Sequence, residues 1–430
     1  MKAFIKRICP EFVLDSYHAI RSNISKKYSA LKHKPLIEQT FRHYAEVEKR
    51  IKSRYDRPLR FASYVVYDST FAAYRLMDLM LAKPEKYAPK IVICPDVSRG
   101  EKNLIAQYKR TKDFFIKKYG SDYVVDGYDE LQDAFLDVSD QFDVIYCANP
   151  YDSMVNEVHG VRYLSQKDVL PVYMSYGFMP DWYSCKIIIP MLEISLFWKV
   201  FVDNKYSYRD YKRYELCKAK NCFLTGYPKM DVLSYFKRIE TAKKRIIIAP
   251  HHTINHGLLP LSNFLQYSDF ILNLPKKYPD VEFVFRPHPL LFVNLVNEGI
   301  WTKSQVDEYI ANIEEAGIFY SVGGGYLDVF VNSDAMIHDC GSFIVEYLFT
   351  GKPCCFVAKK NYQKIFSTLG KACLRHHYLA FDEREICDFI EKVVMYGEDC
   401  LLSKRVEFMQ KHLALNYPNA SEKVLKEISF

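Results

Sequence analysis

The chain has 430 residues, 49% of them hydrophobic and 26% charged, which is typical of globular proteins and too long for one ordinary core. Twelve cysteines occur without a C-x-x-C pair, so neither a disulfide framework nor a zinc site is expected. The cysteines are expected to be reduced thiols in a cytoplasmic protein. The start MKAFIKRICPEF lacks the apolar core of a signal peptide, and polar residues interrupt the most apolar run, 187–202. No transmembrane helix is therefore expected.

Residues 1–57 differ from the rest of the chain. They contain 14 Lys and Arg against 6 Asp and Glu, a net charge of +8, whereas the whole chain carries +7. Apolar residues recur there at helical spacing, first Phe4, Ile8, Phe12 and Ile20, then Leu36, Phe41, Tyr44 and Val47. The pattern predicts one or two basic amphipathic helices. They would lie on an anionic membrane surface or pack on the first domain with a solvated basic face. No nucleic-acid-binding module accompanies the charge, so nucleic acid is not expected as a partner.

Residues 58–235 alternate between short apolar runs and helical patterns. Strands are expected at 61–67, 90–94, 123–125, 142–147, 170–176, 198–202 and 222–224, and helices at 70–81, 101–119 and 131–138. Strands that alternate with helices indicate a parallel, doubly wound sheet. This segment is expected to be the first domain.

Residues 236–430 are expected to form a second domain of the same type. A charged helix at 236–245 would connect the two domains. Strands are expected at 245–249, 281–285, 318–322, 335–337 and 354–357, and helices at 264–277, 303–316, 326–331, 343–349, 383–396 and 403–413. The fold class is thus α/β, with two Rossmann-like halves that face each other across a cleft.

The segment 333–357 is the unit around which the second domain is organised. It reads as strand, turn, helix and strand, and ligands of such sheets bind at the carboxyl ends of the strands. Asp339, Gly341 and Ser342 stand where the helix begins, a place that suits a phosphate. Glu346 follows one helical turn later, where it could reach a ribose hydroxyl. The alternative is that Asp339 and Ser342 only cap the helix.

Arg286 and His288 follow another strand and stand in the sequence R-P-H-P. The flanking prolines restrict the backbone, so both side chains are expected to point in fixed directions at the sheet edge. Both could bind a pyrophosphate, and His288 could protonate or hydrogen-bond a leaving phosphate. The alternative is a strand-terminal turn with a surface arginine.

Four further histidines lie near this edge in the sequence. His251 and His252 follow a strand, but adjacent side chains point in different directions and no H-x₃-H spacing exists, so a metal site is not expected. One of the two, His251, is a candidate phosphate contact, whereas His256 and His338 are expected to be structural. The glycines at 323–325 lack the spacing of known phosphate loops.

Three motifs resemble one enzyme family. The segment D-C-G-S-F-I-V-E-Y at 339–347, with G-K-P at 351–353, resembles the D-Y-S-S-x-x-x-D-Y…K-P signature of the CDP-glycerol glycerophosphotransferases, which build teichoic acids and capsules. G-Y-P-K-M-D at 226–231 and R-P-H-P at 286–289 resemble two further motifs of that family, in the same order. The resemblance implies a GT-B fold and places Lys229 near the donor phosphates.

One position departs from the family pattern. The family carries H-G-x-x-x-K after a first-domain strand, and its His is the base expected to deprotonate the acceptor. In this chain Tyr176 stands in place of that His, and the Lys is missing. Tyrosine, with an ordinary pKa of about 10, is a poor base at neutral pH. We therefore expect Tyr176 to position the acceptor and a carboxylate, Asp181 first and Asp68 second, to take the proton; His159 is a further candidate.

The sequence thus predicts a cytoplasmic transferase, bound peripherally to the plasma membrane, that acts in cell-surface polymer synthesis. It would move glycerol phosphate or ribitol phosphate from a CDP-activated donor to a glycan, polymer or lipid-linked acceptor. No metal or other cofactor is expected besides the donor, which is a substrate. A sugar-nucleotide-dependent GT-B glycosyltransferase and a non-catalytic GT-B-like glycan-binding protein are the alternatives.

Overall fold

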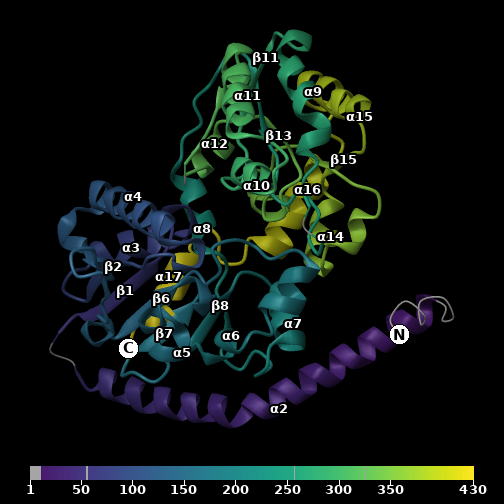
Figure 1. Ribbon diagram of the computed structural model, residues 1–430. Helices are drawn as coiled ribbons and strands as arrows, with labels where there is room; N and C mark the ends of the chain where they lie inside the picture. Colours follow the sequence, from purple (N-terminus) through teal and green to yellow (C-terminus); the bar gives the residue numbers. More distant parts are fainter. Residues whose placement is uncertain (1–10, 55–56, 256, 324) are drawn as a thin grey trace.

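A computed structural model of the protein describes residues 11–54, 57–255, 257–323 and 325–430, and side chains from residue 28 onward. His256, Gly324 and the first ten residues, for which predictions were made above, lie outside the described residues. The chain forms two parallel β-sheets, each covered by helices, with helix α2 along one side (Figure 1).

The first sheet has the strand order β3-β2-β1-β6-β7-β8-β9, and all its pairings are parallel. Its strands are β1 (Leu59–Val65), β2 (Tyr87–Ile93), β3 (Val124–Asp126), β6 (Val144–Cys147), β7 (Leu170–Tyr173), β8 (Lys199–Val202) and β9 (Cys222–Leu224). The main helices around it are α3 (Tyr74–Leu81), α4 (Glu101–Tyr119), α5 (Val161–Leu164), α6 (Leu192–Leu196) and α7 (Lys205–Tyr214). The central strands β6 and β7 are buried along their whole length, as the apolar runs predict for a sheet covered on both faces.

The second sheet has the order β12-β11-β10-β13-β14-β15, again all parallel. Its strands are β10 (Lys244–Ala249), β11 (Val281–Phe285), β12 (Phe319–Tyr320), β13 (Ala335–His338), β14 (Cys354–Val357) and β15 (Tyr378–Ala380). Its helices include α9 (Phe264–Lys277), α10 (Leu291–Asn297), α11 (Lys303–Glu315), α12 (Leu327–Val331), α13 (Phe343–Glu346), α14 (Thr368–Leu374), α15 (Glu383–Asp388) and α16 (Leu402–Phe408).

Two predicted helices are wrong. Residues 131–138 contain no helix: strands β4 (Tyr128–Asp129) and β5 (Ala134–Phe135) form a hairpin, because Asp129 accepts hydrogen bonds from the backbone of Leu131 and Gln132 and thereby stabilises a turn. Residues 236–243 are also non-helical. There Arg238 pairs with Asp334, and the backbone N–H of Ile239 donates to Asn332, so this segment is held against the second domain in an extended form.

The carboxyl ends of the two sheets meet. Gly177, just beyond β7, lies so close to the turn after β13 that an added Cβ would be 3.7 Å from Cβ of Ser342. The chain then crosses back: the last helix, α17 (Ala420–Ile428), lies on the first sheet's side (Figure 1), where it contacts α3 and α8 (Pro228–Asp231). The domain limits at residues 57 and 235 stay predictions.

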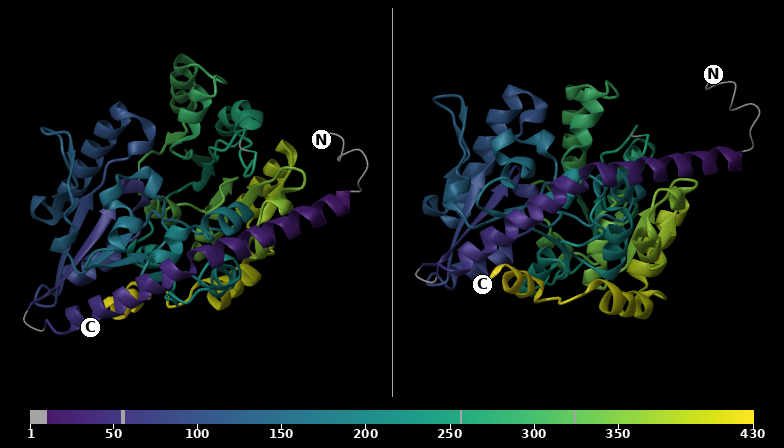
Figure 2. Two further views of the ribbon diagram at one scale, coloured as in Figure 1. Left: turned by 60° about the horizontal axis from the view of Figure 1, so that its bottom comes forward. Right: turned by 90° about the horizontal axis from the view of Figure 1, so that it is seen from below.

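Helix α2 (Glu11–Lys52) is a single helix that runs along the first domain and continues beyond it (Figure 2). Ile37, Tyr44, Val47 and Ile51 are buried on its inner side, and the Tyr44 hydroxyl donates to the carbonyl of Leu196 at 2.6 Å. In contrast, Tyr28 and Leu31 are exposed. The C-terminal part of α2 is therefore part of the first-domain core. Among the described residues, none of the helices is both long enough and apolar enough to cross a bilayer.

Candidate functional site

Three histidines gather at the carboxyl edge of the second sheet. His251 and His252 follow β10, and His288 follows β11; one ring nitrogen of each lies within 4.8 Å of a ring nitrogen of the other two. The ring centroids of His252 and His288 are 4.0 Å apart. The backbone N–H of His288 donates to the carbonyl of Pro250 at 2.9 Å, which ties the two loops together.

Hydrogen bonds indicate which nitrogen of each ring carries the proton. Nδ1 of His288 accepts from the backbone N–H of Leu290 at 3.1 Å, and Nδ1 of His252 accepts from the Asn294 amide at 3.0 Å. That amide also donates to the backbone carbonyl of His252, which fixes its orientation. A neutral ring whose Nδ1 is an acceptor carries its proton on Nε2. Both rings therefore present an N–H donor, which suits an anion better than a metal ion.

A histidine ring ordinarily has a pKa of about 6.5. For His288, burial holds the pKa well below that value, and the nearby charges of His252, His251 and Arg99 lower it further. His288 thus offers a hydrogen bond without a positive charge.

Arg286 lies beside this cluster, but its guanidinium contacts the protein itself. Nη1 donates to Oγ of Ser321 at 2.8 Å and Nη2 to the carbonyl of Gly323 at 2.6 Å, while the group stacks on the ring of Tyr326. Burial lowers its pKa. In this arrangement Arg286 holds the 321–326 loop, and phosphate binding by Arg286 stays a prediction.

A second cluster of polar side chains, Lys229, Tyr326 and Glu346, joins the two domains. Nζ of Lys229, in α8, donates to the carbonyl of Tyr176 at 3.1 Å and to the hydroxyl of Tyr326 at 2.5 Å. The Tyr326 hydroxyl in turn donates to Oε2 of Glu346. Glu346 is fully buried, and its Oε1 lies 4.0 Å from Nζ of Lys229. Tyr326 thus occupies Oε2 of Glu346, whereas the buried Oε1 has no hydrogen-bond partner among the described residues. The predicted ribose contact stays a prediction.

Hydrogen bonds to the side chain of Asp339 stabilise the turn after β13. The two oxygens of Asp339 accept from the backbone N–H groups of His251, at 2.6 Å, and Asn263, at 2.5 Å. Burial raises the pKa of Asp339 to about 7 despite these bonds. Asp339 thus fixes the loop that carries His251. The helix that follows, α13, has four residues, so its dipole adds little to anion binding at Gly341 and Ser342. Direct nucleotide contacts by these three residues stay predictions.

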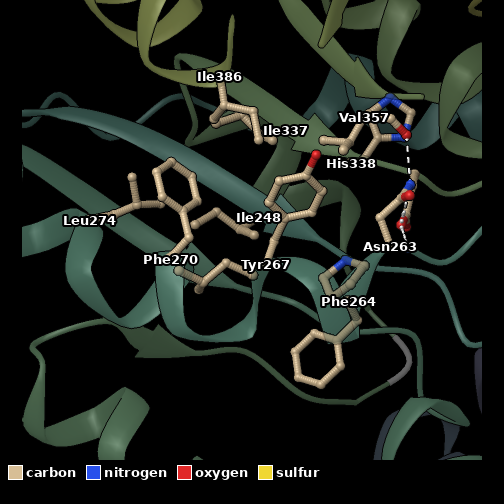
Figure 3. A pocket seen from close by; sticks show the side chains of 13 residues that line it. Ile248, Asn263, Phe264, Tyr267, Phe270, Leu274, Ile337, His338, Val357 and Ile386 are labelled. Carbon is tan, nitrogen blue, oxygen red and sulfur yellow. Dashed lines mark hydrogen bonds between the residues drawn. The ribbon is translucent and has the colours of Figure 1, made fainter. Parts of the chain in front are cut away.

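A cavity beside this turn is too small for a nucleotide. It measures about 40 Å³ and lies between α9 and the sheet, where Tyr267 and Phe270 face Ile248 and Ile337 (Figure 3). At its polar end the Asn263 amide donates to the carbonyl of Val357 at 2.9 Å. Ligand pockets usually enclose about 300 Å³ or more. The cavity is a gap in core packing beside the site.

The first-domain candidates lie in different surroundings. Tyr176 is 39% exposed but deep between the domains, where burial and the charge of Asp181 raise its pKa. Asp181 is buried, its pKa is raised by burial, and its oxygens accept from N–H and Oγ of Ser184. Asp68, beyond β1, faces Arg110 at 3.7 Å. His159 is 3% exposed and packs against Tyr64 in the core, and its role as acceptor base stays a prediction.

Sequence reasoning missed Arg99. This residue follows β2 in a loop at the carboxyl edge of the first sheet, and its charge acts on both His288 and Tyr176. Its position just after the end of a strand, in the sequence Asp96-Val97-Ser98-Arg99-Gly100, was the available signal.

Comparisons with solved structures show the fold. Two Rossmann-like domains whose strand ends face each other define the GT-B architecture. The wall teichoic acid polymerase TagF matches with a TM-score of 0.56 at 12% identity, over 95% of this chain and 97% of that chain. UDP-N-acetylglucosamine 2-epimerases match too, from Listeria monocytogenes with a TM-score of 0.54 (12% identity, 86% and 95% covered) and from Neisseria meningitidis, bound to UDP-GlcNAc, with 0.51 (14% identity, 86% and 99% covered).

The family is shown by sequence. The family model described as CDP-glycerol:poly(glycerophosphate) glycerophosphotransferase matches residues 191–429, and the chain belongs to this family. No curated protein matches the chain. The matched segment includes α8, the histidine cluster and the turn after β13, so the resemblance noted from three short motifs is confirmed.

Proposed function

We propose that the protein transfers glycerol phosphate or ribitol phosphate from a CDP-activated donor to the hydroxyl of a cell-surface polymer under construction. The observation that carries this proposal is the family match, which spans every second-domain residue of the site. The structure adds hydrogen-bond donors, His288 and His252, at the edge where the two sheets meet.

In this reaction the acceptor oxygen forms a bond to the phosphorus next to the polyol. The bond from that phosphorus to the oxygen shared with CMP breaks, and CMP leaves with the electron pair. Nε2–H of His288 would donate to the phosphate oxygens and stabilise the charge that develops on the leaving group. Since His288 is neutral, it acts as a hydrogen-bond donor. We propose that the donor is the only small molecule required.

The proton of the acceptor hydroxyl needs a base. We propose Asp181, because its charge acts on Tyr176 and burial raises its pKa above the ordinary value, which makes it a stronger base. Each carboxylate oxygen accepts about two hydrogen bonds, so the bonds from Ser184 leave capacity for the acceptor. Tyr176 would position the acceptor through its hydroxyl.

A thermal-shift screen tests the donor class. CDP-glycerol, CDP-ribitol and CMP should raise the Tm, since a ligand that binds only the folded state stabilises it, whereas UDP and UDP-GlcNAc should raise it less. A larger shift with UDP-GlcNAc than with either CDP donor would reject the proposed donor and favour a sugar-nucleotide glycosyltransferase.

We also propose that the protein works at the cytoplasmic face of an anionic membrane, held by the basic N-terminal segment, and that it binds no nucleic acid. Support comes from the net charge of +8 in residues 1–57 and from the length of α2 that continues beyond the first domain (Figure 2). Anionic lipids attract such segments by about 1 kcal/mol per basic residue.

A truncation that leaves the buried part of α2 in place tests this membrane role. Deletion of residues 1–30 spares Ile37 to Ile51, which are part of the core, and removes basic residues that include Lys26 and Lys27. The deletion should abolish co-sedimentation with phosphatidylserine vesicles and leave the Tm unchanged, and added salt should weaken binding of the intact chain. Equal sedimentation by both proteins would contradict a membrane role for this helix.

A further inference from the structure

The loop between β2 and α4 is built around one buried carboxylate. Asp96 is fully buried, and its Oδ1 accepts from N–H of Ser98 at 2.8 Å and Oγ of Ser98 at 2.6 Å. Its Oδ2 accepts from the hydroxyl of Tyr67 at 2.5 Å, and its backbone N–H donates to Gln107 at 2.9 Å. A buried carboxylate with this many partners fixes the loop backbone.

Arg99 belongs to this loop. Its Nε lies 3.4 Å from Oδ2 of Asp96, and its guanidinium lies over the ring of Tyr67, 5.6 Å from the centroid. The side chain is nevertheless 40% exposed. Within the part of the chain that the structure describes, no hydrogen bond involves the Nη groups of Arg99. The guanidinium is thus held in place while its two outer N–H groups remain accessible.

Arg99 lies on the side of the first domain that is turned towards the second. The carboxyl edges of the two sheets meet at Gly177 and Ser342, and Arg99 stands on the first of these edges. Its positive charge adds to the burial that lowers the pKa of His288, in the second domain, and partly offsets the burial that raises the pKa of Tyr176, in the first. Arg99 is therefore near both the proposed leaving-group donor and the proposed acceptor-positioning residue.

The negative charge of the proposed donor needs a positively charged residue in the site. A CDP-polyol carries two negative charges on its pyrophosphate, and His288, whose pKa burial lowers, offers it a hydrogen bond without a positive charge. Two other cations at the junction use their N–H groups inside the protein, Arg286 on Ser321 and Gly323, and Lys229 on Tyr176 and Tyr326. A doubly charged ligand in this partly buried site needs a cation that is free to contact it.

We propose that Arg99 is the phosphate-binding cation that the first domain contributes, and that it contacts the phosphoryl group during its transfer. This inference rests on the proposed function for the identity of the donor. The fork of two Nη–H groups matches the oxygens of a phosphate, and it would stabilise them while the acceptor oxygen attacks and CMP departs. Because Arg99 and His288 belong to different domains, the complete site exists only when both sheet edges face each other.

The test compares Arg99→Gln, Arg99→Lys and a matched control, Lys102→Gln, which removes one positive charge from an exposed residue three positions away. In turnover of CDP-glycerol with a polymer primer, Arg99→Gln should lower kcat by about 10²–10³-fold, the usual loss for one preorganised donor to a transition state. Arg99→Lys should recover part of the activity, and Lys102→Gln should match wild type.

A binding measurement separates this inference from the donor assignment. Calorimetric titration with inorganic pyrophosphate should show at least a ~10-fold weaker Kd for Arg99→Gln than for wild type and Lys102→Gln, whatever nucleotide the enzyme uses. An NMR titration should show a higher pKa for His288 in Arg99→Gln, a change that a merely structural arginine far from the site would not produce. Unchanged pyrophosphate affinity in a folded Arg99→Gln protein would overturn the inference, and absence of turnover with every CDP donor in wild type would instead reject the proposed function.

Discussion

Burial lowers the pKa of one histidine at the site and of two in the core. His288 lies beside other histidines and Arg99, whose charges lower its pKa further, whereas His338 and His377 are buried inside the second domain. At the site, neutrality together with an acceptor bond at Nδ1 leaves an N–H donor for a phosphate. In the core, the lowered pKa means that the two rings stay unprotonated in the folded state at a pH where the unfolded chain binds protons.

The second case gives a prediction for stability. The rings of His338 and His377 lie 5.5 Å apart, and burial lowers the pKa of His377 to about 3. Below the ordinary pKa of about 6.5, the unfolded chain binds protons that folded His377 does not, so its contribution to stability falls as the pH falls, by up to about 1.4 kcal/mol per pH unit. Asp339 and Glu215, whose pKa values burial raises to about 7, act in the opposite direction, so the prediction concerns a difference between variants.

Urea unfolding at pH 7.5, 6.5 and 5.5 measures that difference. The destabilisation of His377→Gln relative to wild type should shrink as the pH falls below 6.5, because only wild type has a histidine that must stay neutral. His33→Gln, on α2, is the control and should show no such trend. A destabilisation by His377→Gln that is the same at all three pH values would show that His377 binds protons equally in the folded and unfolded states, which contradicts a lowered pKa in the fold.

The acceptor base gives a prediction for activity. Asp181→Asn should reduce kcat by ~10²–10⁴-fold, the usual contribution of a positioned base, whereas Tyr176→Phe should reduce it less. Since Asp181 also accepts from Ser184, a Tm measurement must accompany the assay. Donor affinity should change little in both variants. If folded Asp181→Asn and Asp68→Asn proteins both keep full turnover, neither carboxylate is the base.

Sequence reasoning found most residues that line the domain junction but not their contacts. Motif spacing located Lys229, Arg286 and Glu346, yet the bonds that link them to Tyr326 and Gly323 depend on a loop whose position no local pattern specifies. Arg99 was missed because an exposed arginine after a strand has no distinctive neighbours in sequence; only the approach of the second domain places it near His288.

Among the elements, buried strands and long helices were predicted best. The apolar runs of β11 and β14 and the helical periodicity of α4 and α9 predicted their bounds correctly, because burial on both faces and a regular apolar stripe leave strong patterns. Residues 131–138, which include the second strand of the hairpin at 128–135, were predicted as a helix because the turn of this hairpin depends on one aspartate, Asp129, and not on periodicity. The extended segment at 236–243 depends on distant partners, Asn332 and Asp334.

The C-terminal end of helix α12 is stabilised by a lysine from another segment, and this contact gives a prediction for stability. Nζ of Lys352, in the G-K-P motif, donates to the carbonyls of Phe330, Val331 and Ser333 at 3.0, 2.6 and 2.5 Å. Lysine at the C-terminus of a helix satisfies unpaired carbonyls and complements the dipole. Lys352→Met should lower the free energy of unfolding by about 1.5–3 kcal/mol, the range for hydrogen bonds to a charged group.

Urea denaturation measures this loss, with Lys360→Met on an exposed lysine as the control. Because α12 follows directly after Tyr326, Lys352→Met should also weaken the contact between Lys229 and Tyr326. A Lys352→Met protein as stable as the control variant would mean that water replaces the lysine at these carbonyls.

In the whole molecule, the two domains are linked on both sides of the site. At the strand ends, Lys229 joins Tyr176 to Tyr326, and at the back α17 returns to the first domain, where Asp231 accepts from N–H and Oγ of Ser421 at 2.7 Å each. These links hold the first-domain loop with Arg99 opposite the second-domain loop with His288. We therefore propose that residues from both domains bind the phosphate.

The most direct test is the release of CMP from CDP-glycerol and CDP-ribitol by the intact protein, with and without a polyol-phosphate primer. We expect primer-dependent CMP release by wild type with at least one donor, and a loss of about 10²-fold or more in a folded His288→Ala protein, since one preorganised donor to the leaving phosphate is removed. His33→Ala should match wild type. CMP release that is unchanged in His288→Ala would contradict the assigned site, and the absence of release from both CDP donors, with turnover of a UDP-sugar instead, would contradict the assigned reaction.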